Sequence, residues 1–526
     1  MERVSFFDER SRGETRLLFF VNRFFYQSKK KSAQNVVKYD KLDIDKFIEE
    51  LFMTTTQLRS EKRPENPIFQ PIKKLEFPVA FFLVFAMVFG LIFIKTIPPL
   101  QAPDEVGHLV KAYSLSRFKV RPETRTGDEP KKSDQTWGFY GFEVSDEIYR
   151  MNEYAIQKWG ENEKYPYMIK SDGDDSDKFI GTGGMTNYSF VNYIPQITGI
   201  WVGKLFNQRP LNQYYIARYF NLFAYIFVVF AALAIFPFSK WGGVVIGLNP
   251  MAMFLASTVS GDAMIIAGGF FFTSWILHLR EKKRISSPAM LISMIMMIGL
   301  VLMKPTMITL GLLFFLLPNR ALNIRRKIVW GLLILALSVG FYLWWNSFMV
   351  DQQILYRDFA SPSKQVAAFF KDPSIFLTNF YENYVLGIKG DYITRSAVGD
   401  FGLLDAPMAT HWIIFYFSIL IVGSLLQKED GGTLALYQKG IIVLLLVLYT
   451  LLTFFALYQI WNPVNAKKTI EGLQGRYFIP VGLTMVPLFS SHGKGLDVSK
   501  RSMNVILSVS LVILFLVALT VLDKRY

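Results

Sequence analysis

Long hydrophobic runs recur along the chain from residue 77 to its end, and polar segments of very different lengths separate them. Runs of about 18 or more apolar residues can cross a lipid bilayer as an α-helix, and soluble domains lack them. The pattern therefore predicts an all-α polytopic membrane protein. The candidate spans are Phe77–Ile97, Tyr193–Phe206, Tyr214–Phe236, Trp241–Ser257, Asp262–Leu279, Pro288–Met303, Thr306–Leu317, Val329–Phe348, His411–Leu426, Ile441–Tyr458, Tyr477–Phe489 and Val505–Val521.

Basic loops indicate the direction in which these helices cross, because loops rich in Lys and Arg stay in the cytoplasm. The strongest are Arg280–Arg284 and Asn319–Lys327. With a cytoplasmic N-terminus, both loops face the cytoplasm only when one early candidate does not cross. Tyr193–Phe206 is that segment, because it is short and contains one proline and two glycines. We expect it to lie at the outer surface, which leaves about eleven crossings.

The polar segments define the expected domain organisation. Residues 1–75 form a mixed-charge cytoplasmic extension, and residues 76–526 form the transmembrane domain. Residues 98–213 make up a first large extracytoplasmic loop with juxtamembrane helices, and residues 349–410 make up a second. The acidic stretch Ser171–Lys178 lacks the glutamate that completes an EF-hand calcium loop, so a solvated turn is the simpler interpretation.

Charge and cysteine content narrow the class of partners. A formal net charge of +15 would indicate nucleic acid in a soluble protein. In a membrane protein, cytoplasmic basic loops and anionic lipid headgroups account for it, so we expect membrane lipids and no nucleic acid as partners. The chain has no cysteine, which excludes disulfides, thiolate metal ligands and cysteine nucleophiles.

The segment PPLQAPDEVGH (Pro98–His108), directly after the first span, carries the clearest chemistry. Its first two prolines end the spanning helix, and its third suits the first turn of a new one. Asp104 then stands at a helix N-terminus, which stabilises its charge and leaves it able to accept a proton. Asp104 and His108 share a helix face, whereas Glu105 points about 100° away. A surface helix with a polar cap is the simpler alternative.

The predicted topology brings ionisable residues from distant parts of the chain to one face of the membrane. Ionisable groups at membrane depth are costly and are candidates for function. Those at the outer face are Asp104, Arg218, Asp262, Lys304 and Arg476, with Gln474 and Tyr477 beside Arg476, and Lys389 and Arg395 in the second outer loop. A single basic residue often only reaches for lipid headgroups. Several charges of both signs at one face suit a phosphate-bearing lipid substrate and a neutral acceptor.

Several of these residues lie in motifs that resemble a known family. The motifs are PPLQAPDEVGHLVKAY (Pro98–Tyr113), YIPQITGIWVGKLF (Tyr193–Phe206), YIARYFN (Tyr215–Asn221), STVSGDA (Ser257–Ala263), LMKPT (Leu302–Thr306) and GLQGRYFIP (Gly472–Pro480). In this order they are similar to a bacterial membrane-protein family called domain of unknown function 2142, a branch of the GT-C glycosyltransferase superfamily. The resemblance implies a GT-C-like helical fold, a catalytic Asp or Glu in the first outer loop, and a polyprenyl-phosphate sugar donor.

The residues and the resemblance together lead us to expect a membrane glycosyltransferase. It would move a sugar from a polyprenyl-phosphate-linked donor to a hydroxyl of a cell-surface glycan or glycolipid, with inversion, at the outer face of the cytoplasmic membrane. The expected catalytic residues are Asp104, as general base, and Glu105 in support. The substrate-binding candidates are His108, Arg218, Asp262, Lys304, Lys389, Arg395, Gln474, Arg476 and Tyr477.

Two points stay open at this level. GT-C branches differ in their use of metal, and the chain shows no recognisable metal-ligand spacing, so no cofactor is assigned and a divalent metal is left open. A transporter or flippase of lipid-linked glycans is the alternative function, and a non-catalytic scaffold is a third. Transporters place charges near the membrane midplane and use paired, broken helices, of which Lys304-Pro305 is a partial match.

Overall fold

The computed structural model describes residues 75–124, 140–157, 176–349, 359–387, 389–425, 434–466, 471–489 and 499–526, all within the unit Leu75–Tyr526. The predicted cytoplasmic extension, residues 1–75, lies outside the described residues except for Leu75. So does most of the acidic stretch Ser171–Lys178, of which the last three residues are described.

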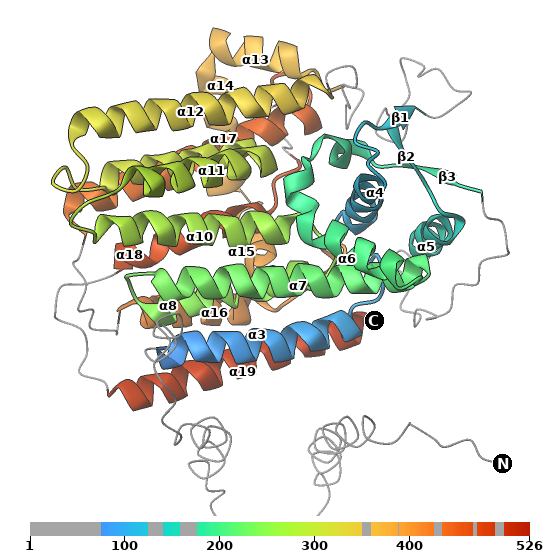
Figure 1. Cartoon of the computed structure of the whole chain (residues 1–526), viewed down its shortest axis with the longest axis horizontal. Helices are drawn as coiled ribbons and strands as arrows, with labels where there is room; N and C mark the ends of the chain where they lie inside the picture. The colour runs from blue at the N-terminus through green and yellow to red at the C-terminus, as the bar shows by residue number, and fades with distance from the viewer. Residues whose placement is uncertain are drawn as a thin grey trace, which may run out of the picture. The chain divides into compact units, whose positions relative to one another are not determined.

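Six helices in this part of the chain are long and apolar enough to cross a membrane. They are α3 (Phe77–Thr96), α7 (Pro210–Ile235), α10 (Asp262–Arg280), α12 (Ile324–Ser347), α17 (Leu436–Trp461) and α19 (Lys500–Arg525). Their axes run side by side in a bundle (Figure 1). The prediction of a mostly helical, polytopic membrane protein is confirmed.

Other apolar segments of the bundle are shorter or broken. They are α8 (Lys240–Gly247), α9 (Pro250–Ala256), α11 (Ser287–Met303), the 3₁₀-helix η6 (Pro305–Leu316), α16 (Thr410–Leu425), the 3₁₀-helix η8 (Gly475–Met485) and α18 (Val486–Phe489). Proline shapes several of them: Pro250 begins α9, Pro305 begins η6, and Pro480 lies inside η8. Every predicted span coincides with helical structure, and the number of eleven crossings stays a prediction.

The polar region after α3 folds at one end of the bundle (Figure 1). Its helices are α4 (Glu105–Ser116), α5 (Asp146–Gln157), η4 (Gly183–Asn187), η5 (Phe190–Tyr193) and α6 (Ile194–Leu205). It also contains an antiparallel sheet in the order β1 (Glu123–Thr124), β2 (Tyr140–Val144), β3 (Lys178–Gly181). The expectation of helices alone is corrected here, because strands of two to five residues are too short to show a clear alternating pattern.

The described end of the acidic stretch has a structural role. Asp177, directly before β3, forms an ion pair of 2.5 Å with Arg117, the C-cap residue of α4. Both side chains are about one-third exposed, so the pair is a surface contact of modest strength. This part of the stretch therefore connects the sheet to α4.

Helix α6 corresponds to the segment that we expected not to cross the membrane. Its 12 residues are too few to span a bilayer. A Cβ atom on Gly199 would lie 2.7 Å from the Cα of Ala217, and one on Gly203 would lie 2.8 Å from the side chain of Gln213. These glycines let α6 pack closely and antiparallel along the first half of α7. The placement of α6 at the outer surface stays a prediction, and the structure adds that α6 packs against α7.

The region between α12 and α16 contains α13 (Pro362–Lys371), α14 (Pro373–Phe380), a π-helical turn (Tyr381–Val385), α15 (Lys389–Val398) and the paired strands β4 (Asp400–Phe401) and β5 (Ala406–Pro407). Helix α15 packs directly on the start of η8. A Cβ atom on Gly475 would collide with the carbonyl oxygen of Ile393 and lie against Ala397. Glycine at position 475 therefore allows the backbones of α15 and η8 to approach closely.

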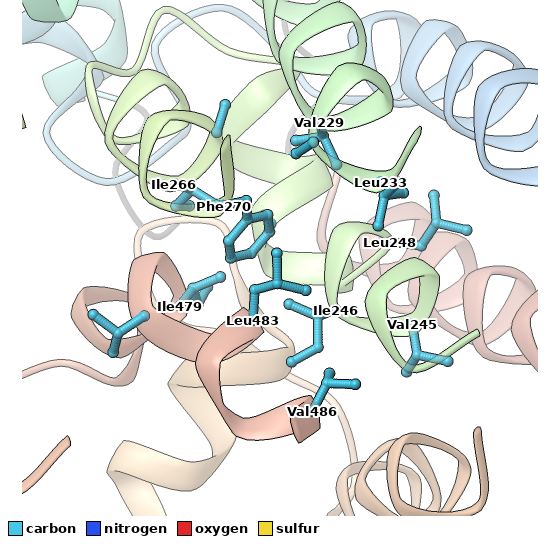
Figure 2. Close-up of a cluster of buried hydrophobic side chains, with 14 of the residues drawn as sticks. Val229, Leu233, Val245, Ile246, Leu248, Ile266, Phe270, Ile479, Leu483 and Val486 are labelled. Carbon is cyan, nitrogen blue, oxygen red and sulfur yellow. The ribbon is translucent and has the colours of Figure 1, made fainter. Parts of the chain in front are cut away.

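The core that positions the site is built where α7, α8, α10 and η8 meet. Figure 2 shows side chains of these elements, among them Val229, Ile246, Phe270 and Leu483, pointing into one apolar cluster. A Cβ atom on Gly269 would collide with the carbonyl oxygen of Pro480, so α10 and η8 approach at backbone distance. This contact holds the middle of η8 against α10.

Candidate functional site

Asp104 is placed by the short connection between α3 and α4. It occupies the N-cap position of α4 with φ of 61°, a left-handed conformation that aspartate adopts more readily than most residues. Its side chain makes no capping hydrogen bond, so the stabilisation by the helix N-terminus that we predicted is not its main interaction. Instead, its Oδ2 accepts a hydrogen bond of 2.5 Å from Nη2 of Arg476.

Arg476 lies at the centre of the site and is only 3% exposed. Its Nη1 is 3.3 Å from Oδ2 of Asp262, the first residue of α10. Its Nε donates to Oε1 of Gln474 over 2.6 Å, and its Nη2 donates to the hydroxyl of Tyr477 over 3.4 Å. Two carboxylates, from Asp104 and Asp262, therefore share one guanidinium. The structure brings together these residues from three distant segments, as the predicted topology required.

Lys304 supplies a second cation. It lies between α11 and η6, and its Nζ is 4.3 Å from the centre of the Tyr477 ring, within the range of a cation–π contact. Burial lowers the pKa of Lys304 to about 8, against the attraction of Asp262. Lys304 is therefore mostly protonated at neutral pH, and it can attract an anion that approaches Arg476.

His108 lies one turn after Asp104 on α4. Its Nδ1 is 2.7 Å from the hydroxyl of Tyr193, and the ring of Tyr188 packs against it. Burial lowers the pKa of His108, and the attraction of Asp262 and Asp104 only partly offsets this effect. The imidazole is therefore neutral at neutral pH, and it offers a hydrogen bond without adding charge.

Asp104 is the most open charged group of this cluster. Its side chain is 39% exposed, compared with 1% for Arg476 and 12% for Asp262. Partial burial raises the pKa of Asp104, but the attraction and hydrogen bond of Arg476 outweigh it, so the net pKa is lowered. The carboxylate is therefore ionised at neutral pH and accessible to another molecule.

Glu105 has a different environment and is only 1% exposed. Its Oε1 accepts hydrogen bonds from the hydroxyl of Tyr214 at 2.8 Å and from the backbone N–H of Val259 at 2.9 Å. Its Oε2 accepts one from the N–H of Ala102 at 3.2 Å. Nε of Arg218 lies 3.4 Å from Oε1. The carboxylate thus joins α4, α7 and the turn before α10.

This arrangement favours a structural role for Glu105 and Arg218, and the catalytic role expected for Glu105 and the substrate-binding role expected for Arg218 stay predictions. Arg218 is fully buried, and its Nη1 donates to the carbonyl oxygen of Ile97 over 2.8 Å. Both side chains are closed to solvent where α4 packs near α7. We call these two residues the Glu105–Arg218 pair and assign it a structural role.

Lys389 and Arg395 both lie on α15, and they differ in their relation to the site. Lys389 lines a cavity of about 570 Å³ together with Glu471 and Gln474, and Gln474 also binds Arg476. Lys389 is therefore next to the cluster. Arg395 is paired with Asp391 of its own helix at 2.9 Å, and no contact links it to Asp104 or Asp262.

Sequence reasoning missed the polar residues that hold these elements together. Nδ2 of Asn192 donates to the carbonyl oxygen of Met303, next to Lys304, over 3.3 Å. Nε2 of Gln196 donates to Oδ1 of Asn221 over 2.8 Å, and both side chains are fully buried. The sequence did contain a signal for them, namely Asn and Gln side chains within apolar segments. A buried amide side chain requires a hydrogen-bond partner, so such residues are expected to connect elements.

The residues do not fit a divalent metal site. Among the residues that the structure describes, no group of three His, Asp or Glu side chains could hold a metal ion. The two carboxylates that come close together, Asp104 and Asp262, are both neutralised by the guanidinium of Arg476. A metal ion would have to displace that cation, so we derive no step through a metal.

The helical bundle and its cluster of charges define a multi-pass membrane protein. A family described as "Predicted membrane protein (DUF2142)" matches residues 87–485, about three-quarters of the chain, and the protein belongs to this family. The resemblance recognised in the sequence motifs is thereby confirmed for the family. No curated protein and no solved structure matches the chain.

Proposed function

We propose that the protein is a glycosyltransferase that takes a sugar from a polyprenyl-phosphate-linked donor. The acceptor is a hydroxyl of a cell-surface glycan or glycolipid. The reaction takes place at the outer face of the cytoplasmic membrane, in a chain that crosses it eleven times from a cytoplasmic N-terminus. The observation that supports this proposal best is the open carboxylate of Asp104 on the buried cation of Arg476, with the half-buried Lys304 close by on the Tyr477 ring.

The reaction needs a base for the acceptor and a cationic site for the leaving group. Asp104 accepts the proton of the acceptor hydroxyl while its oxygen forms a bond to the anomeric carbon. The bond from that carbon to the donor phosphate breaks, and the phosphate leaves with the electron pair. Arg476 and Lys304 stabilise the charge that builds on the phosphate. Direct displacement of this kind inverts the anomeric carbon.

The ion pair between Asp104 and Arg476 links donor binding to base strength. A donor phosphate competes with the carboxylate for Nη2 of Arg476, which carries the 2.5 Å hydrogen bond. Partial withdrawal of Arg476 raises the pKa of Asp104, because the attraction that lowers it is weakened. A general base works best when its pKa approaches the working pH, so donor binding prepares Asp104 for catalysis.

The acceptor has an approach from the side of α15. The cavity lined by Lys389, Glu471 and Gln474 carries polar side chains and connects to Arg476 through Gln474. Such a mixed polar lining suits hydroxyl groups of a glycan. His108 is neutral and close to Asp104 on α4, so it can orient the same hydroxyl.

The direct test uses purified protein in detergent with a lipid-linked sugar donor and a soluble glycan acceptor. The Asp104→Asn variant removes the base and leaves Asp262 to pair with Arg476, so it should fold normally. Transfer should fall by about 10²–10⁴-fold, the usual contribution of a general base. Wild-type turnover in Asp104→Asn would refute the assignment of the base.

A transporter of lipid-linked glycans remains the second candidate function, because the bundle contains broken helices. The helical structure is interrupted between α8 and α9, at Leu248 and Asn249. Nδ2 of Asn249 donates a hydrogen bond to the carbonyl oxygen of Ala397. Discontinuous helices of this kind form substrate sites in transporters. Donor cleavage in detergent, where no compartments exist, supports the enzyme; lipid movement across vesicles without cleavage supports the transporter.

A further inference from the structure

A second candidate binding site lies at the other end of the bundle from the charge cluster. An apolar groove of about 440 Å³ runs between η6 and α12, and Met297 of α11 and Leu448 of α17 also line it. Isoleucine, leucine and phenylalanine side chains form most of its walls. Several of them, including Ile328 and Phe315, are more than half exposed, so the groove is open to the hydrocarbon around the bundle.

Two glycines and the helix type create the space. A Cβ atom on Gly331 of α12 would meet nothing within 4 Å, and one on Gly311 of η6 would meet only the end of Met297, at 3.8 Å. In a 3₁₀-helix, side chains three residues apart stack in straight rows. Ile308, Gly311 and Phe314 form such a row, which leaves a continuous channel beside α12.

The dimensions of the groove match one leaflet of a bilayer. On α12 it extends from Ile324 to Leu335, about 16 Å at 1.5 Å per residue. The hydrocarbon core of a bilayer is about 30 Å thick, so the groove accommodates a chain from one leaflet. This leaflet is on the side of the loop between η6 and α12, which lies at the end of the bundle opposite to α4 (Figure 1).

Basic residues stand at the mouth of the groove. Arg320, Arg325 and Arg326 are exposed, and none of them forms an ion pair with a residue in the described ranges. Lys327 also lines the groove, and its Nζ donates to Oδ1 of Asn319 over 2.8 Å, which fixes the loop. Unpaired arginines at a membrane surface attract anionic headgroups.

We propose that this groove binds one anionic phospholipid, with an acyl chain between η6 and α12 and its headgroup on Arg325 and Arg326. The groove supplies apolar contact along a single leaflet, and the arginines supply the charge selectivity. Lys304, at the outer end of η6, does not line the groove and stands four residues before Ile308, the first groove residue of η6. That is about 8 Å at the 3₁₀ rise of about 2 Å per residue, so the lipid site is distinct from the phosphate contacts of the proposed sugar donor. The inference does not rest on the proposed enzymatic function.

Native mass spectrometry of the delipidated full chain tests the proposal. Phosphatidylglycerol and phosphatidylcholine with the same acyl chains are added in turn to the protein in detergent. We expect wild-type protein to retain one phosphatidylglycerol, and to retain phosphatidylcholine about tenfold less well. Equal retention of the two lipids would overturn the assignment of the headgroup site.

Matched variants locate the lipid. Gly331→Phe fills the groove and should reduce retention of phosphatidylglycerol by about tenfold or more, because the acyl chain loses its apolar contact. Gly340→Phe is the control, since Gly340 lies on the same helix, also has nothing within 4 Å of its Cβ position, and does not line the groove. Gly311→Leu fills the groove from the opposite wall and repeats the test if Gly331→Phe folds poorly.

Two further results decide the chemistry of the occupant. The double variant Arg325→Gln, Arg326→Gln should keep lipid in the groove but remove the preference for phosphatidylglycerol. Undiminished retention in both groove-filling variants would refute the location. A polyprenyl phosphate that co-purifies with the protein and is displaced by Gly331→Phe would refute the phospholipid in favour of the donor lipid.

Discussion

Asp104 and Glu105 are neighbours in the sequence, and each faces an arginine, yet their environments are opposite. The Glu105 carboxylate is closed to solvent and binds a tyrosine hydroxyl, two backbone N–H groups and Arg218. The Asp104 carboxylate is 39% exposed and is bound by Arg476 through one hydrogen bond. A buried carboxylate with four partners stabilises the fold. An open carboxylate with a single partner can instead leave that partner and bind another molecule.

The same difference separates the two arginines. Arg218 donates to the carbonyl oxygen at the end of α3 and lies within 3.4 Å of Glu105, so it connects helices. Arg476 contacts two carboxylates, one of which is open to solvent. Each guanidinium has one buried N–H without a hydrogen bond of good geometry to a described residue, Nη1 in Arg476 and Nε in Arg218. The difference is therefore the open carboxylate beside Arg476, which a transient anion can replace.

The largest expected effect is on stability. Glu105→Gln leaves Arg218 buried without its counter-charge, which should lower the free energy of unfolding by about 3–5 kcal/mol. Asp104→Asn is the matched control, and it should cost about 1 kcal/mol or less, because Asp104 is open and Arg476 keeps Asp262. Thermal unfolding in detergent measures both. Equal losses in the two variants would remove the distinction between the neighbouring carboxylates.

The next effect is on the proposed reaction. Arg476→Gln removes the cation that faces the leaving phosphate, and sugar transfer should fall by about 10²–10³-fold. The measurement is the transfer rate at saturating donor, with unfolding followed in parallel to show that the variant is folded. Lys389→Gln is the comparison, since it alters the polar cavity but leaves the phosphate contacts intact. A normal rate in Arg476→Gln would exclude Arg476 from catalysis.

A smaller effect should appear in the pH dependence. Arg476 lowers the pKa of Asp104 in the donor-free protein, so kcat/KM of the wild type, which reports the free protein, should hold to a pH below the ordinary aspartate value before it falls. In Arg476→Gln only the attraction of His108 opposes the effect of burial, which is the larger, and the acid limb should move to higher pH. The free energy of unfolding should change with pH in the same direction. The ion pair stabilises the folded protein at pH values above the pKa that Asp104 has in the unfolded chain, and this stabilisation is lost as the pH falls through the lower pKa of the folded protein. An acid limb at the same pH in both proteins would show that Asp104 is not the titrating base.

The smallest effect is expected at α15. Arg395 and Asp391 form a partly exposed pair within one helix, and such pairs contribute roughly 0–1 kcal/mol. Arg395→Gln should therefore change the unfolding temperature little and leave sugar transfer within about twofold of wild type. A larger loss of transfer would show that Arg395 takes part in substrate binding, although in the structure it is paired with Asp391.

The sequence was sufficient to predict the helical segments and to predict which charged residues lie close together in the site. Long apolar runs marked every helix of the bundle, and the basic loops placed Asp104, Asp262, Lys304 and Arg476 at one face. In the structure Arg476 pairs with Asp104 at 2.5 Å and with Asp262 at 3.3 Å. Lys304 lies 4.3 Å from the centre of the Tyr477 ring, which is next to Arg476. The positions of the charged residues therefore predicted which distant parts of the chain lie together, because a charge near a membrane is stable only when it is paired.

Other features were not predictable from local patterns. The roles of Asp104 and Glu105 depend on contacts with residues more than 100 positions away, such as Tyr214 and Val259 for Glu105. The orientation of α6 depends on the fit of Gly199 against α7, which hydropathy does not register. The strands β1 to β3 pair through backbone hydrogen bonds between very short segments, so they have almost no signature in the sequence.

The left-handed backbone of Asp104 affects how mutations at this position should be interpreted. Alanine in that conformation carries a backbone penalty of roughly 1–2 kcal/mol, whereas asparagine tolerates it nearly as well as aspartate. An alanine scan would therefore report a mixture of lost charge and a displaced turn between α3 and α4. Asparagine changes the charge while the turn is retained, so a screen limited to alanine would overstate what the carboxylate itself contributes.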